Sequence, residues 1–221
     1  MKVPLVFIPG LGADSRLFLR QKKAFKRCLC ASWLEPKKKE TLANYAHRWA
    51  KLLKLKSGCY LAGVSFGGMV ALEMARWVKP RAVILIGSCR SPSSIPLSLR
   101  IAGLLPTWPR VSKKLCRVFP ITSGYFLGAK TKSQRDLLIR MFLETPNGFA
   151  KWTVEAIQGW KGYRGERTRV YHIHGGKDHL IPLRRVQPDE VVLDGGHLIS
   201  LTHPREVNGF IRQCLQRRTP K

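Results

Sequence analysis

The sequence predicts an α/β fold, with a mostly parallel sheet that carries helices on both faces. Short and almost wholly apolar runs, at 3–8, 59–64 and 82–86, alternate with longer segments whose apolar residues recur at helical spacing. Strands without a polar face are buried on both sides, as in parallel sheets between two helical layers. A chain of 221 residues has room for one such domain. We find no internal repeat or linker, so we predict a single domain over residues 1–221.

The first part of the chain, up to residue 87, contains four predicted strands and three predicted helices. In order they are a strand at 3–8, a helix within 17–30, a strand at 32–34, a helix at 42–53, a strand at 59–64, a helix at 68–78 and a strand at 82–86. Thr41 is the expected N-cap of the second helix. His47 lies on that helix, and we expect it to be structural or exposed.

The segment from residue 88 to 169 interrupts this alternation. It is too long for one crossover, and its pattern predicts short helices around 97–105, 109–118, 133–144 and 148–159. An insertion between strands of such a sheet is typically a lid over the site, here at approximately 89–165. Strands at 170–173 and 191–193 follow, and a helix at 204–216 with proline in its first turn ends the pattern.

A motif at residues 63–67 places one serine at the junction of a predicted strand and a predicted helix. Gly63-Val64-Ser65-Phe66-Gly67 matches the pattern G-x-S-x-G. A sharp turn there holds the serine in an unfavourable backbone conformation, and the glycines let neighbouring backbone approach. The helix amides then point toward negative charge beside Ser65. The alternative is a simple turn that happens to contain serine.

A serine nucleophile needs a base, and the base needs an acid that orients it. Ligand sites in parallel α/β sheets gather at the carboxyl ends of strands, so these partners should follow later strands. Asp178 follows the strand at 170–173, and His197 lies just beyond the strand at 191–193. The order Ser65, Asp178, His197 is that of hydrolases with this kind of turn. We predict these three residues as a catalytic triad.

Other histidines fit the role of base less well. His172 and His174 lie within or at the end of an apolar strand, so packing or loop hydrogen bonds explain them. His179 is next to the acid and is expected to face away from the triad. His203 precedes Pro204 and is interpreted as a helix-start residue.

Two other positions for the acid are less suitable. Asp194 is the main rival of Asp178, but it is too near His197 in the sequence to reach round the imidazole. Some hydrolases of this type carry the acid after the preceding strand, and no Asp or Glu occurs between Glu73 and Asp136. We therefore favour Asp178.

An oxyanion hole requires two backbone amides. Phe66, directly after the serine, is expected to supply one of them. Leu11, in the loop Pro9-Gly10-Leu11-Gly12-Ala13-Asp14 after the first strand, is expected to supply the other. A tight turn is the alternative for this loop, which lacks the dinucleotide-binding pattern G-x-G-x-x-G.

The chain resembles the α/β-hydrolase superfamily, and looks like a small esterase- or thioesterase-like serine hydrolase. The matching segments are FIPGLGAD, GVSFGGMVALEMA, HIHGGKDHLIP and GGHLISLTHP, in this order between positions 7 and 204. The resemblance implies hydrolysis of a small-molecule ester or thioester through an acyl-enzyme intermediate. It also implies a six-stranded core, since the leading strands of the full eight-stranded sheet are missing. The first loop has PGLG instead of the common HG start.

The same residues leave other activities open. Acyl transfer or hydrolysis of a C–C bond could use the same triad. A further alternative is a non-catalytic lipid- or nucleic-acid-binding protein that has kept the hydrolase fold, because fold alone does not fix function.

The charge of the chain is strongly positive, with 40 Lys and Arg residues against 13 Asp and Glu, a net charge of +27. Residues 88–135 hold nine basic residues and no acidic one, mixed with large apolar residues. Such a lid is suited to an anionic membrane surface or an anionic substrate. An ordinary amphipathic lid, and a general basic bias without a partner, are the alternatives. Nucleic acid is not expected, because no RNA-binding signature or basic stripe is present.

The cysteine pattern and the apolar segments indicate the compartment. The six cysteines form no CxxC pair, and no His/Cys cluster has the spacing of a zinc site. The N-terminal segment lacks the apolar region and cleavage site of a signal peptide, and no apolar stretch approaches about 18 residues. We therefore expect a reduced, cytoplasmic protein without a metal or cofactor.

Overall fold

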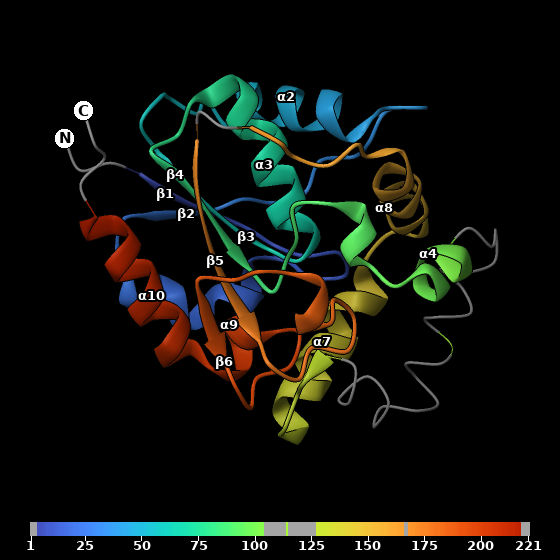
Figure 1. The fold of residues 1–221 in the computed structure, drawn as a ribbon. Helices are drawn as coiled ribbons and strands as arrows, with labels where there is room; N and C mark the ends of the chain where they lie inside the picture. The colour runs from blue at the N-terminus through green and yellow to red at the C-terminus, as the bar shows by residue number, and fades with distance from the viewer. Residues whose placement is uncertain (1–3, 104–113, 115–126, 166–167, 218–221) are drawn as a thin grey trace.

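The computed structural model describes residues 4–103, 114, 127–165 and 168–217. Within these residues the chain forms one six-stranded parallel sheet (Figure 1). Its strands are β1 (Leu5–Ile8), β2 (Cys28–Cys30), β3 (Tyr60–Val64), β4 (Ala82–Ile86), β5 (Arg169–Gly175) and β6 (Glu190–Val192). The predicted α/β class and the six-stranded parallel sheet are confirmed.

The strand order places β1 in the interior of the sheet. The order is β2-β1-β3-β4-β5-β6, so the chain leaves β1 toward one edge and returns on its other side. Leu5 is paired with Cys28 of β2 on one side and with Tyr60 of β3 on the other. Parallel sheets bind ligands where the strand order reverses, outside the carboxyl ends of the strands. Here that position lies between the loop after β1 and the turn after β3.

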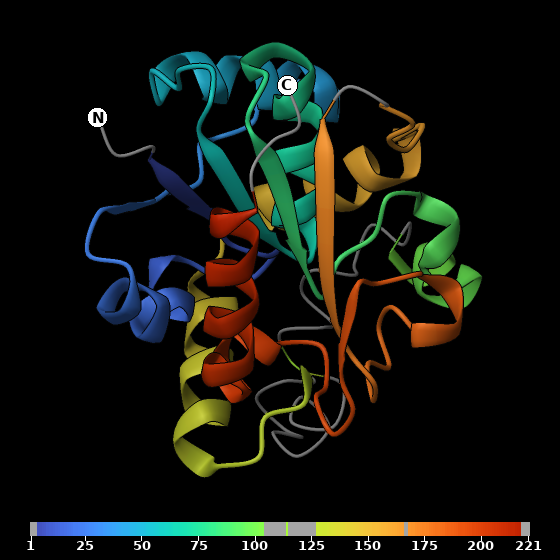
Figure 2. The same ribbon diagram turned by 60° about the vertical axis from the view of Figure 1, so that its left-hand side comes forward.

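Helices cover both faces of the sheet (Figures 1 and 2). One layer contains α1 (Leu19–Ala24), α9 (Ile199–Thr202) and α10 (Pro204–Gln216), and the other contains α2 (Leu42–Leu52), α3 (Phe66–Val78) and α8 (Asn147–Gly159). Alternate residues of β1, β3 and β4 pack into two buried apolar clusters, one on each face of the sheet. On β1, Leu5 and Phe7 face the α10 side, and Val6 and Ile8 face the α3 side.

The prediction for residues 17–34 is wrong in detail. Instead of one helix within 17–30, the structure has a 3-10 helix at Ser15–Phe18 and α1, which ends before Phe25. The strand is β2 at 28–30 and not 32–34. At 33–34 the chain bonds to loop and side-chain groups: Trp33 Nε1 donates to the Ala13 carbonyl (3.0 Å) and the Leu34 N–H donates to the Tyr45 hydroxyl (3.0 Å). These contacts replace strand pairing there.

The segment between β4 and β5 contains helices, as expected. The described ones are a 3-10 helix at Pro92–Ser94, α4 (Leu97–Gly103), α7 (Lys132–Glu144) and α8. The last residues of the helix expected at 97–105, and nearly all of the one expected at 109–118, lie outside the described residues. Met141 of α7 packs into the α10-side cluster and Phe149 of α8 into the α3-side cluster. Among the described residues, no helix is long and apolar enough to cross a membrane.

Candidate active site

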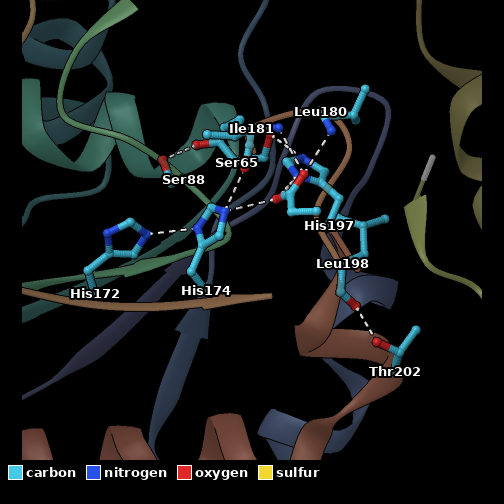
Figure 3. Close-up of polar contacts among 10 residues, drawn as sticks. Ser65, Ser88, His172, His174, Leu180, Ile181, His197, Leu198 and Thr202 are labelled. Atoms are coloured by element: carbon cyan, nitrogen blue, oxygen red, sulfur yellow. Dashed lines mark hydrogen bonds and ion pairs between the residues drawn. The ribbon is translucent and has the colours of Figure 1, made fainter. Parts of the chain in front are cut away.

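Ser65 lies in the turn between β3 and α3. Its backbone angles, φ 52° and ψ −122°, fall outside the regions that residues other than glycine normally occupy. Neighbouring backbone holds it there, since its N–H donates to the Ile86 carbonyl (3.1 Å) and its carbonyl accepts from the Gly68 N–H (2.9 Å). The Ser88 hydroxyl also donates to the Ser65 carbonyl (2.7 Å; Figure 3). The strained turn places the serine hydroxyl at the carboxyl edge of the sheet.

Both glycines of the motif lie where backbone segments touch. A Cβ atom at Gly67 would be 2.2 Å from the carbonyl oxygen of Pro9, and one at Gly63 would be 2.3 Å from that of Gly67. Real Cβ atoms do not approach other atoms so closely. A larger residue at either position would push the turn away from the loop after β1.

Ser65, His197 and Asp178 form one hydrogen-bonded chain. Nε2 of His197 lies 2.9 Å from the Ser65 Oγ (Figure 3), and Nδ1 lies 2.7 Å from Oδ2 of Asp178. Because Nδ1 faces a carboxylate, it carries the proton of the neutral imidazole, and Nε2 can accept the serine proton. His197 and Asp178 are 3% and 4% exposed, whereas Ser65 is half-buried. The structure thus brings together the three residues predicted as a triad.

Two glycine pairs bring the loops of Asp178 and His197 into contact. A Cβ atom at Gly175 would lie 2.1 Å from the carbonyl oxygen of Gly196, and one at Gly176 would lie 2.6 Å from that of Leu193. The Lys177 N–H donates to the Gly195 carbonyl across the same contact (2.8 Å). The paired glycines let the acid and the histidine meet although they follow different strands.

Asp178 is held as a carboxylate by its surroundings. The Leu180 and Ile181 N–H groups both donate to its Oδ1 at 2.8 Å. Burial alone raises its pKa, but the charge of His197 and the hydrogen bonds from His174, His197 and Ile181 together hold the pKa of Asp178 well below its usual range. The carboxylate can therefore orient and stabilise a protonated His197.

His174 is a second histidine on Asp178, although its place in an apolar strand predicts only a packing or loop role. Its Nε2 lies 3.2 Å from Oδ2 of Asp178 and 2.8 Å from the Ile181 carbonyl oxygen, and its Nδ1 lies 3.0 Å from His172 Nε2 (Figure 3). Both histidines are buried on one face of β5. Their spacing of two residues on a strand, with an acid four residues further on, is the signal that could have identified this chain of contacts.

Apart from His172 and His174, the other residues considered as acid or base lie away from this chain of hydrogen bonds. Asp194 is exposed and pairs with Lys130 Nζ (2.5 Å) and His203 Nε2 (3.3 Å), and not with His197. The ring of His47 stacks on Trp77. His179 is exposed to solvent. Of the two acids considered, only Asp178 lies against His197.

The predicted oxyanion amides flank Ser65. A Cβ atom at Gly10 would lie 3.3 Å from the Ser65 Cβ, so the loop after β1 passes directly beside the serine. Within the described residues, no hydrogen bond from the Leu11 N–H is present. Phe66 is the first residue of α3, so its N–H has no acceptor in the helix. Both amides are available to a ligand beside Ser65.

Helix α7 contacts the loop after β1. Gly12, with φ +74°, lies so close to Phe142 that a Cβ atom there would be 2.4 Å from Cδ2 of the ring. Arg16, just beyond the loop, pairs with Asp14 (2.6 Å) and with Glu144 at the end of α7. The helix therefore helps to fix the position of the Leu11 amide.

An aromatic cavity of about 810 Å³ is lined in part by Ala13 and Asp14 of this loop, and not by Ser65, Asp178 or His197. Trp33, Phe149 and Trp152 line it, and Lys37, Lys38 and Lys39 stand among its wall residues. The ring of Phe66 packs against Trp33 (5.5 Å between centroids) and Trp152 (6.0 Å). Phe66 thus joins the turn at Ser65 to the wall of the cavity.

A protein-family model described as "Alpha/beta hydrolase family" matches residues 5–210, which is most of the chain. The protein belongs to the α/β-hydrolase family. This result confirms the superfamily that the four sequence segments indicated. No curated protein matches the chain.

Solved α/β-hydrolase structures share the fold of this family member at low sequence identity. An esterase from Exiguobacterium antarcticum has a TM-score of 0.78 at 15% identity, over 97% of this chain and 92% of that one. An esterase from Thermogutta terrifontis has 0.68 at 19%, over 98% and 90%. An enol-lactonase from Burkholderia xenovorans has 0.70 at 14%, over 97% and 92%. At these identities the similarity concerns the fold.

Proposed function

We propose that the protein is a serine hydrolase that cleaves carboxylic ester or thioester bonds through an acyl-enzyme intermediate. The observation that carries this proposal is the hydrogen-bonded chain from Ser65 Oγ through His197 to Asp178, with distances of 2.9 and 2.7 Å. It lies where the strand order reverses, beside two amides that have no described acceptor. The family, and the esterases and lactonase that share the fold, support hydrolysis as the reaction class.

In the first half-reaction, Ser65 Oγ attacks the carbonyl carbon while Nε2 of His197 takes the serine proton. The carbonyl π electrons move to the oxygen, and the Leu11 and Phe66 N–H groups stabilise that oxyanion. The C–O or C–S bond then breaks as the carbonyl re-forms. His197 returns its proton to the departing alcohol or thiol, and the acyl group remains on Ser65.

In the second half-reaction, His197 takes a proton from water, whose oxygen attacks the acyl carbon. The tetrahedral intermediate collapses with release of the acid, and Ser65 Oγ recovers its proton from His197. Throughout, Asp178 keeps the imidazole in one tautomer and offsets its transient positive charge. No cofactor is needed for these steps.

We further propose that the segment at about 89–165 is a lid on a single domain. Its helices α7 and α8 supply Met141, Phe149 and Trp152 to the aromatic cavity, and α7 contacts the loop that carries Leu11. Such a lid shapes the substrate site. An anionic membrane or substrate stays a prediction, since much of the basic segment lies outside the described residues.

The described cysteines are unpaired, which supports the expected reduced, cytoplasmic location.

Labelling with a fluorophosphonate probe tests the proposed nucleophile. The wild-type protein should be labelled, and Ser65→Ala should not be, because the probe bonds only to an activated serine. Ser57→Ala removes an exposed serine whose hydroxyl donates to the Lys79 carbonyl (3.2 Å), and it should be labelled like the wild type. Folded wild-type protein that is not labelled, or Ser65→Ala protein that is, would contradict the proposal.

A substrate panel then separates esters from thioesters. p-Nitrophenyl esters or acyl-coenzyme A thioesters of graded chain length should be hydrolysed, with a burst of the first product wherever deacylation is the slower step. Labelling without turnover of any panel member would place the activity with acyl transfer or C–C bond hydrolysis instead.

A further inference from the structure

A second recess lies beside β5, outside the proposed reaction centre. It has a volume of about 410 Å³, and its walls come from the segment after β4 and from the 3-10 helix Leu183–Arg185 with the residues that follow it. Its lining includes Arg90, Ser91, His172, Arg184, Arg185 and Gln187. Ser65, Asp178 and His197 do not line it.

The recess gathers positive charge that nothing nearby neutralises. Three of its lining residues are arginines, and no Asp or Glu is among the described residues that line it. Within the described part of the chain, no salt bridge involves Arg90, Arg184 or Arg185. Asp189, two residues after Gln187, accepts from the His172 N–H (2.7 Å) and does not line the recess. Three arginines therefore line a shared space without a described counter-ion.

Two of these arginines are anchored by backbone carbonyls from other segments. Arg90 Nη2 donates to the Val170 carbonyl (3.0 Å), and Arg185 Nη1 donates to the Ser93 carbonyl (3.1 Å). A guanidinium has five N–H donors, so one such bond leaves most of them for a ligand. The anchors hold the two groups in place from opposite walls. This arrangement lowers the conformational cost of binding an anion.

We propose that this recess binds the phosphate group of a soluble small molecule. Guanidinium groups bind phosphate with paired hydrogen bonds, and three of them can share the charge of a dianion. The Ser91 hydroxyl and the Gln187 amide add uncharged donors of the kind that position phosphate oxygens. A carboxylate carries one charge and two oxygens, and would leave part of this donor set unused. The recess favours a soluble ligand over a flat membrane surface.

The recess is also joined to the proposed triad by buried hydrogen bonds. His172 forms part of its lining and is 2% exposed. Its Nε2 lies 3.0 Å from Nδ1 of His174, whose Nε2 is 3.2 Å from Oδ2 of Asp178 (Figure 3). A dianion beside His172 would act electrostatically on this chain of contacts. The binding site itself does not depend on the proposed hydrolase activity.

Calorimetric titration with inorganic phosphate and pyrophosphate, at constant ionic strength set with chloride, tests the proposal. Both anions should bind the wild-type protein, and pyrophosphate should bind more tightly because of its higher charge. The double variant Arg184→Gln/Arg185→Gln should bind at least about tenfold more weakly, since it loses two charged donors. Both side chains are exposed, so the variant should fold, and its melting temperature without phosphate checks this.

A matched control removes the same charge elsewhere. Arg20→Gln/Arg205→Gln replaces two other exposed arginines and should keep wild-type affinity. An equal loss in both double variants would mean that phosphate responds only to the net charge of +27, and would overturn the site. Malonate bound as tightly as pyrophosphate would overturn the assignment to phosphate.

Vesicles separate the two sources of a phosphate group. If vesicles containing phosphatidic acid bind through Arg184 and Arg185 while phosphate and pyrophosphate do not bind, the ligand is a lipid headgroup and the assignment to a soluble molecule is wrong. The supporting result is that both soluble anions bind the wild type and Arg20→Gln/Arg205→Gln, and that binding is lost in Arg184→Gln/Arg185→Gln alone.

Discussion

Asp178 has more hydrogen-bonding partners than its contact with His197 requires. Two backbone amides hold Oδ1, and His174 and His197 share Oδ2. A carboxylate oxygen with two imidazole partners has little freedom to rotate, so His174 fixes the acceptor that His197 must meet. We therefore interpret His174 as a positioning residue that acts through Asp178.

Replacing His174 tests this interpretation. His174→Leu removes the hydrogen bond to Asp178, and kcat should fall by about tenfold to a hundredfold, the value of a hydrogen bond to a charged group, with little change in KM. His174→Gln retains an N–H donor and should restore part of kcat. Steady-state kinetics on the best ester of the panel measure both values.

The fall in kcat of Asp178→Asn is the reference for the smaller fall expected of His174→Leu. This change should lower kcat by about 10⁴-fold, because the histidine tautomer would then be wrong. If His174→Leu keeps wild-type kcat while remaining folded by circular dichroism, or if Gln and Leu give equal rates, His174 only fills space.

Among the residues of the candidate site, the sequence predicted those in turns between strands and helices. It missed the polar contacts of a residue within a strand. Ser65, Asp178 and His197 stand in turns marked by glycine, where a polar residue has no packing role. His174 lies in an apolar strand, and only the three-dimensional approach of the Asp178 loop gives it a polar partner. Ser88 follows β4 in a loop and was missed for a different reason: its bond to the Ser65 carbonyl depends on the pairing of β3 with β4, which no local pattern shows.

At the scale of elements, the loop after β1 is held between the turn at Ser65 and helix α7. Gly10 lies against Ser65, and Gly12 lies against Phe142. Leu11 lies between these two contacts in the chain. The proposed oxyanion hole therefore depends on how α7 packs, and not only on the loop itself.

Gly12→Ala should disturb this arrangement. An alanine at φ +74° is strained, and its Cβ would overlap the ring of Phe142, so the loop and the Leu11 N–H must move. We expect kcat/KM to fall by about a hundredfold, close to the cost of losing one oxyanion donor. Fluorophosphonate labelling should slow in parallel, because its transition state uses the same amides.

Gly58→Ala is the matched control for Gly12→Ala. Gly58 has φ +83°, but a Cβ atom there would meet nothing within 4 Å. The Gly58→Ala variant should lose melting temperature, as Gly12→Ala does, because alanine is strained at a positive φ. Its kcat/KM should stay unchanged. Equal activity in both variants would show that the contact between α7 and the loop does not position the amide.

Helices and strands were predicted well where a buried face sets the spacing of apolar residues along the chain. They were predicted poorly at the edge of the sheet. The strand at 82–86 and the helix at 204–216 agree with β4 and α10 residue for residue. The strand expected at 32–34 failed because β2 is an edge strand of only three residues, which is too short for its own sequence pattern to mark it. Its register is set by pairing with β1, which a local pattern cannot reveal.

At the scale of the whole molecule, the sheet and its loops bring together charges that unfolding would separate. His172 lies among Arg90, His174 and Asp178 in the folded protein. Burial, followed by the electrostatic effects of His174 and Arg90, lowers the pKa of His172 to about 3, and the opposing effects of Asp178 and of Ser88 are weaker. The folded protein therefore keeps this ring neutral across a range in which a free histidine is protonated.

The free energy of unfolding should consequently depend on pH through His172. A histidine in the unfolded chain has a pKa of about 6.5, so below that pH the unfolded chain takes up a proton that the folded protein does not bind. Stability from this residue is complete above about pH 6.5 and is lost as the pH falls toward about 3, by about 1.4 kcal/mol per pH unit. Between about pH 6.5 and pH 5 the loss should be about 2 kcal/mol.

Urea unfolding of the wild type and of His172→Gln over this range measures the effect, because glutamine does not titrate. The carboxylates with lowered pKa values, Asp14, Glu40, Asp178 and Asp194, act mainly below about pH 5. These carboxylates and the remaining histidines are common to both proteins, so they largely cancel in the difference. The variant should be less stable than the wild type at neutral pH, since it loses the contact with His174, yet its stability should fall less steeply as the pH is lowered. Parallel curves would mean that the folded protein protonates His172 as readily as the unfolded chain does. The positive surroundings of that ring would then be screened by solvent or by a bound anion.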